Sequence, residues 1–108
     1  MLFVSMKQSP QKTIKMEKLT LIKGSFDAED ASEILLNLFS SKLQFHSLKN
    51  FSSMERFGVE DPISAQRIPE LKKTLGLIEK ILADAKRSNL RLSLHADVIV
   101  ELQPNDSL

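Results

Sequence analysis

The predicted topology of this chain depends on the stretch LQFHSLKNF, Leu43 to Phe51, and on whether it forms a strand. Leu43 and Phe45 would point to one face of a strand. His46 and Leu48 would point to the other. We predict a strand here, although its alternation is imperfect. A strand and then a helix precede it in the predicted order, so this strand implies parallel pairing through a right-handed crossover.

The residues before this stretch predict a strand followed by a helix. KLTLIKGSF, Lys18 to Phe26, alternates weakly and predicts the first strand. Asp27 is placed to cap a helix, and two acids follow in the first turn, where negative charge suits the positive end of the helix dipole. Apolar residues then recur at spacings of three and four up to Phe39, and Lys42 closes the last turn.

The residues after this stretch predict a capped turn and then a second helix. Ser52 and Glu55 have the spacing of a capping box, and Gly58 suits the left-handed conformation that ends a helical turn. Asp61 and Pro62 predict the next helix start, because aspartate caps free amides and proline at the first position sacrifices no hydrogen bond.

The second predicted helix contains a proline and a wide apolar stripe. Pro69 would remove a backbone hydrogen bond, so the segment either kinks near Ile68 or divides into a short and a longer helix. Leu77 lies off the stripe and is predicted to be exposed, and Asn89 can stop the helix in the left-handed conformation. The predicted core-facing residues are Ile68, Leu71, Leu75, Ile78, Leu82 and Ala85, with Ile81 widening the stripe.

The stretch LRLSLHADVIVEL, Leu90 to Leu102, alternates apolar and polar residues, with Ile99 as the one exception. This pattern predicts a strand with one buried and one wet face. Because strands usually have about five or six residues, either the end overhangs the sheet or a bend near Ala96 and Asp97 forms a hairpin. An overhanging edge could pair with another copy of the chain.

These elements predict an α/β fold, a two-layer β-α-β-α-β sandwich. Two helices would cover one face of a small three-stranded sheet, and the other face would stay polar. We expect residues 17–103 to form a single globular domain, residues 1–16 a disordered extension and residues 104–108 a frayed tail. Met1 and Met16 are both possible translation starts.

Composition narrows the classes of function. The chain of 108 residues has no cysteine, which excludes disulfides, cysteine nucleophiles and thiolate metal sites and fits the cytoplasmic location that we predict. No apolar run approaches the roughly 18 residues that span a bilayer, so we expect no membrane association. The net charge is +1, with acids and bases interspersed, which disfavours nucleic-acid binding.

Polar residues that follow the two predicted parallel strands supply a candidate binding site. Open α/β sheets bind ligands at the carboxyl ends of their strands. Ser25 from the first loop would meet Asn50, Ser53 and Arg56 from the second, and the capped turn leaves those three unexplained. We take these four residues as candidates for binding a small ligand or an anion.

His46 and His95 are weaker candidates. If they were neighbours on adjacent strands, they could bind a metal or act as acid and base. Their spacing is not that of a zinc site, and the sequence has no phosphate-binding glycine loop or nucleophile elbow. We therefore predict no catalytic residue, no metal and no cofactor.

Three functions follow, in order of preference. The first is a small non-catalytic interaction or assembly module, forming a homo-oligomer through strand 90–102 or binding an unknown protein partner. The second is a small-ligand or anion-binding protein, or a weak enzyme, that uses the loops after the first two strands. The third, nucleic-acid binding through the sheet face, is disfavoured because the strands lack exposed aromatic residues interleaved with bases.

Overall fold

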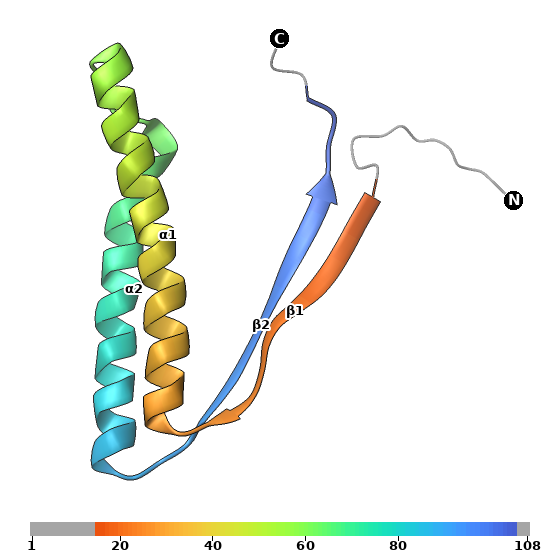
Figure 1. The fold of residues 1–108 in the computed structure, drawn as a ribbon, viewed down its shortest axis with the longest axis vertical. Coiled ribbons are helices and arrows are strands. Elements are labelled where there is room, and N and C mark those ends of the chain that lie inside the picture. The colour runs from red at the N-terminus through yellow and green to blue at the C-terminus, as the bar shows by residue number, and fades with distance from the viewer. Residues whose placement is uncertain (1–14, 106–108) are drawn as a thin grey trace, which may run out of the picture. The chain divides into compact units, whose positions relative to one another are not determined.

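The computed structural model describes residues 15–105 and has the element order β-α-α-β (Figure 1). The elements are β1 (Lys15–Phe26), α1 (Ala28–Phe57), α2 (Pro62–Arg87) and β2 (Leu92–Leu102). Strands β1 and β2 form a two-stranded antiparallel sheet, here called the β ribbon. Helices α1 and α2 lie side by side and run in opposite directions as a helical hairpin. Residues 25–93 and the remaining described residues form two compact units.

The predicted β-α-β-α-β sandwich with a three-stranded sheet is wrong, because residues 43–51 are helical. A single helix of 30 residues, α1, contains the predicted first helix, the predicted second strand and the predicted capped turn. Without a strand at 43–51 there is no parallel pair and no crossover. The two strands that exist pair with each other in antiparallel fashion.

The stripe of buried and half-buried residues along α1 explains why the helix continues past Lys42. The hydrophobic pattern fades because the last three members of the stripe are polar. Phe45, Leu48 and Phe51 are exposed and lie off the stripe, which gives this segment its misleading alternation. The stripe recurs every three or four residues and consists of Ala31, Leu35, Phe39, Leu43, His46, Asn50 and Ser53.

The ends of α1 are capped by two of the residues that the sequence indicates. Asp27 Oδ1 accepts a hydrogen bond from the Asp30 backbone N–H at 2.8 Å. Gly58 has a φ of 72°, in the left-handed region, and its N–H donates to the Met54 carbonyl at 3.0 Å. Ser52 and Glu55 lie inside the helix, so the predicted capping box is wrong.

Helix α2 starts and stops where the sequence predicts, but it is not divided. The carboxylate of Asp61 accepts a hydrogen bond from the Ser64 N–H at 3.0 Å, and Asn89 ends the helix with a φ of 55°. The helix continues through Pro69, so the predicted division into two helices does not occur. Pro69 is exposed, and the Ala65 carbonyl that it deprives of a partner can bond to water.

The core of the hairpin consists of small and aliphatic side chains. The prediction that Leu77 is exposed is confirmed, since 53% of it is accessible. Ile81 is 56% exposed, so the prediction that it widens the core stripe is wrong. Ile68 and Leu75 are half-buried. The buried apolar residues are Ala31, Leu71, Ile78, Leu82 and Ala85.

The β ribbon has one apolar face. Lys18 Nζ lies 3.7 Å from Asp97 Oδ2, so these two side chains share one face of the pair of strands. Alternate residues point the other way. Strand β2 runs unbroken, and the predicted hairpin alternative at Ala96 is therefore wrong. The opposite face also carries Glu17 and Lys23 of β1. It is here called the ribbon apolar face after its apolar residues Leu19, Leu21, Leu94, Ala96, Val98, Val100 and Leu102.

Candidate functional site

A cluster of hydrogen bonds, here called the loop clasp, holds the connection between α1 and α2. His46 Nδ1 and Ser64 Oγ are hydrogen-bonded at 2.9 Å, and both residues are buried. The Asn50 side-chain oxygen accepts a hydrogen bond from the Asp61 N–H at 2.8 Å. Ser53 Oγ donates to the Val59 carbonyl, also at 2.8 Å. The polar part of the α1 stripe is therefore satisfied by the loop and by the start of α2.

Three of the four predicted binding residues come together near the loop clasp. Asn50 and Ser53 direct hydrogen bonds to the loop, and Asn50 Nδ2 also donates to Glu60 Oε2 at 3.4 Å. Arg56 lines a small cavity of about 200 Å³ together with Lys49, Ser52, Ser53, Phe57 and Asp61. A binding role for Asn50, Ser53 and Arg56 stays a prediction.

The fourth residue, Ser25, does not join them. It precedes α1, whereas Asn50 lies near the other end of the helix, and the rise from Ala28 to Asn50 is about 33 Å at about 1.5 Å per residue. Ser25 instead accepts hydrogen bonds from Arg91, at 3.1 Å to Oγ and 3.0 Å to its carbonyl. The expected convergence depended on parallel strands, and the fold has none.

The electrostatics of the loop clasp favour a neutral histidine and an ionised aspartate. Burial lowers the pKa of His46, and the positive charges of Lys42, Arg67 and Lys49 lower it further. The backbone hydrogen bond from Ser64 lowers the pKa of Asp61, and the Ser64 hydroxyl adds to this effect. Near neutral pH the lowered pKa of His46 favours the neutral ring, and the lowered pKa of Asp61 favours the ionised carboxylate.

The clasp includes a serine, a histidine and an aspartate, but its geometry does not suit nucleophilic catalysis. Ser64 is 0% exposed, so its hydroxyl cannot reach a substrate. The Asp61 carboxylate accepts from the Ser64 N–H, not from the His46 ring, so no carboxylate orients the histidine as in a triad. The cluster holds the hairpin together.

The two histidines do not form the pair that the sequence suggested. His46 is in a helix and cannot neighbour His95 across adjacent strands. His95 Nε2 lies 3.3 Å from Asp97 Oδ1 on the wet face of the ribbon. Within residues 15–105 no group of three or more histidine and acidic side chains could hold a metal ion.

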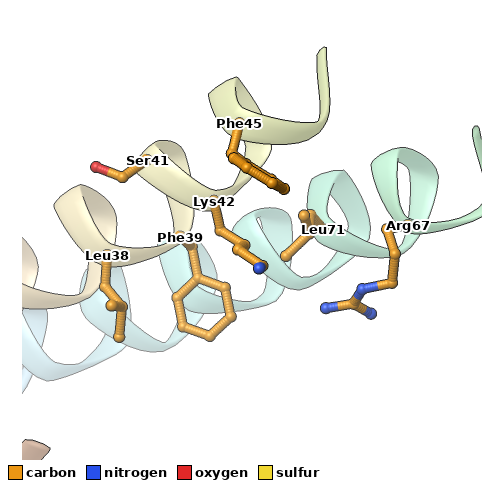
Figure 2. Close-up of a pocket in the computed structure, with 7 residues that line it drawn as sticks. All are labelled: Leu38, Phe39, Ser41, Lys42, Phe45, Arg67 and Leu71. Atoms are coloured by element: carbon orange, nitrogen blue, oxygen red, sulfur yellow. The ribbon is translucent and has the colours of Figure 1, made fainter. Parts of the chain in front are cut away.

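One side of the helical hairpin contains an open groove of about 480 Å³ (Figure 2). Phe39, Leu38 and Leu71 line its apolar part, while Lys42 and Arg67 bring positive charge to it. The ammonium of Lys42 is 5.0 Å from the centre of the Phe45 ring, and Arg67 pairs with Glu70 at 2.5 Å. The groove is thus mainly apolar, with the charge of Arg67 paired to Glu70 and the Lys42 ammonium lying over an aromatic ring.

The groove is part of a longer apolar surface. With 3.6 residues per turn, further large residues of both helices fall on the same side of the hairpin as Leu38 and Phe45. Sequence reasoning singled out only Leu77 among them, because the misassigned strand hid the helical spacing in α1. This surface, here called the hairpin apolar face, carries the exposed side chains Leu38, Phe45, Ile63, Leu77 and Ile81, with Lys42 and Arg67 among them.

Neither the search for membrane-spanning helices nor the comparison with known proteins adds a candidate site. No helix within residues 15–105 is long and apolar enough to cross a bilayer. Comparison with protein-family models, with curated proteins and with solved structures finds no match for this chain.

Proposed function

We propose that this protein is a non-catalytic assembly module that self-associates through its β ribbon, whose apolar side chains and strand edges one chain leaves exposed. The observation that carries the proposal is the ribbon apolar face. Four of its members, Leu19, Leu21, Val98 and Val100, are between 41% and 52% exposed. A two-stranded ribbon is marginally stable in water by itself, and contiguous exposed apolar surface marks sites of protein association.

A second copy suits this surface because of the strand edges. Each strand of the ribbon has one neighbour in the described residues, so each has an outer edge free for pairing. Strand edges pair through backbone hydrogen bonds, and the pairing persists when the two strands match in length and alternation. Another copy supplies such a strand.

The proposal extends the prediction made from the alternation of residues 90–102, and it includes the predicted cytoplasmic location, which the lack of cysteine supports. The alternative of a small-ligand site gains no comparable support. The hydrogen bonds of Asn50 and Ser53 are directed to the loop, and Ser25 lies at the other end of α1.

Light scattering and sedimentation over a range of concentrations test the proposal. We expect the full chain to form a dimer or a larger closed assembly. Val98→Lys, on the ribbon apolar face, should raise the dissociation constant at least about tenfold, which corresponds to about 1.4 kcal/mol. Thr20→Lys, the control on the opposite face of the ribbon in β1, should change it less than about twofold. A strict monomer at high concentration would overturn the proposal.

A further inference from the structure

Strand β2 and the residues just before it have a symmetry that goes beyond alternation. Ala96 is the midpoint of residues 90–102, with the basic residue types on one side of it and the acidic ones on the other. His95 precedes it directly and Asp97 follows directly. Arg91 lies five residues before it and Glu101 five residues after. The sequence is therefore complementary to its own reverse.

Antiparallel pairing makes use of this symmetry. When two β2 strands run in opposite directions about a two-fold axis at Ala96, residues equidistant from Ala96 lie opposite each other. His95 then faces Asp97 of the second copy. Arg91, which precedes β2 and also donates hydrogen bonds to Ser25 of its own chain, faces Glu101 of the second copy. The axis repeats each pair, so both copies gain the same two contacts. Opposite charges placed across a strand pair are stabilising.

The apolar face matches in the same register. Leu94 lies opposite Val98 of the second copy, Leu92 opposite Val100, and Ala96 opposite its own counterpart. The small Ala96 side chain at the axis lets the two backbones approach without a clash between large groups. The ribbon apolar faces of both copies then lie on the same side of one continuous sheet.

We infer that two copies of the chain pair through the free edge of β2 about a two-fold axis at Ala96, giving a four-stranded antiparallel sheet in the order β1-β2-β2-β1. This inference rests on the proposed function and specifies its partner and register. Within each chain β2 pairs with β1 on one edge, so the other edge carries the new backbone hydrogen bonds.

Neighbouring registers lack this complementarity. Moving the axis one residue forward puts Asp97 opposite Asp97 of the second copy, and moving it one residue back puts His95 opposite His95. Two aspartates directly opposite each other repel, and two histidines opposite each other lose the contact between His95 and Asp97. Placing the axis midway between two residues, for example between Ala96 and Asp97, brings the apolar face of one strand to the same side as the polar face of the other. Of these registers, the one centred on Ala96 alone matches both faces.

The other free edge of the ribbon fits less well. An antiparallel pair of β1 strands centred on Thr20 would place Lys18 opposite the apolar Ile22 of the second copy. Lys18 already lies 3.7 Å from Asp97 in its own chain. In the β2 pairing, Asp97 keeps this contact and its 3.3 Å approach to His95 of its own chain. His95 of the second copy would become a third partner of this carboxylate.

Disulfide formation in single-cysteine variants tests the inference, because the natural chain has no cysteine. Ala96→Cys puts two sulfurs opposite each other, and Cα atoms in antiparallel pairs are about 4.5 to 5.5 Å apart, within disulfide range. Ser93→Cys is the matched control, since its two copies would lie about 20 Å apart at about 3.4 Å per residue. We expect mild oxidation to link Ala96→Cys at least about tenfold faster than Ser93→Cys.

A second arm checks the register without relying on position 96. Ser93 lies opposite Ile99 of the second copy, so a mixture of Ser93→Cys and Ile99→Cys chains should form mixed disulfides, recognised by mass, while each variant alone should not. Equal linking rates for Ala96→Cys and Ser93→Cys, or efficient linking of Thr20→Cys instead, would overturn the inference. If the unmodified chain is a dimer in that case, the proposed function stands; a strict monomer overturns both.

Discussion

Every fully buried side chain in residues 15–105 belongs to the helical hairpin, whereas β1 and β2 have none. The hairpin has an apolar core centred on Leu71, Ile78 and Leu82 and a polar clasp at its loop. The ribbon has the alternation of a half-buried sheet, but its apolar side is exposed. The hairpin can thus stabilise itself, while the ribbon needs a second surface to gain from the same hydrophobic effect.

A charge in the hairpin core should cause the largest loss of stability. Ile78→Asp should abolish folding, because an unpaired carboxylate would replace a side chain that is 8% exposed, at a cost above about 4 kcal/mol. Lys73→Asp, at an exposed position of α2, is the matched control and should change the free energy of unfolding by no more than about 0.5 kcal/mol. Circular dichroism during urea unfolding measures both. A folded Ile78→Asp chain of unchanged stability would contradict the assigned core.

The loop clasp should show the next largest effect. Ser64→Ala removes the hydrogen-bond partner of a buried histidine and should cost about 1 to 3 kcal/mol of unfolding free energy. Ser52→Ala, at an exposed position in α1, should stay within about 0.5 kcal/mol. Adding His46→Leu to Ser64→Ala should recover stability, because neither polar partner then remains. Equal losses in the two serine variants would show that the clasp contributes nothing.

Acid should weaken the hairpin through the clasp. The pKa of His46 is lowered in the folded state, so the unfolded chain binds more protons, and the stabilisation present above the unfolded value of about 6.5 is lost as the pH falls below it. The lowered pKa of Asp61 acts in the same direction at more acidic pH, below its ordinary value near 3.8. We expect Tm to fall between about pH 7.5 and about pH 5.5.

His46→Asn is the control for this pH dependence, because it retains a hydrogen-bonding group near the position of Nδ1 but cannot titrate. Its Tm should vary less over the same pH interval. An identical pH profile in the variant and the natural chain would place the titrating group elsewhere.

The smallest effect should come from the ribbon. The ion pair between Lys18 and Asp97 spans 3.7 Å, and the Lys18 side chain is 70% exposed, so water screens it. Lys18→Ala should cost no more than about 0.5 kcal/mol beyond the control Lys23→Ala, measured by urea unfolding. A larger difference would show that this pair anchors the ribbon more strongly than an exposed ion pair does.

The helix ends were predictable from the sequence because they depend on neighbouring residues. Asp27 and Asp61 cap the amides three residues later in the chain. Gly58 and Asn89 end the helices in the left-handed conformation. The core stripe of α2 was also predictable, except at Ile81, because nearly all its inward positions are apolar.

The candidate site was less predictable because it depended on the fold. Asn50, Ser53 and Arg56 are near one another for a local reason, their spacing on one helix. Ser25 was grouped with them only because two strands were expected to be parallel. The hairpin apolar face is not predictable from a strand at residues 43–51, because a strand does not place Phe45 on the same side as Leu38 and the exposed residues of α2.

The helix caps, the apolar stripe of α2 and the alternation of β2 follow from local sequence, since each depends on contacts or periodicity within a few residues. The helical conformation of residues 43–57 depends instead on contacts with the returning chain. Polar His46, Asn50 and Ser53 can occupy the inner stripe of α1 because the returning chain supplies a hydroxyl, an amide and a carbonyl as their partners. Those partners are 6 to 18 residues away, beyond the reach of any local pattern.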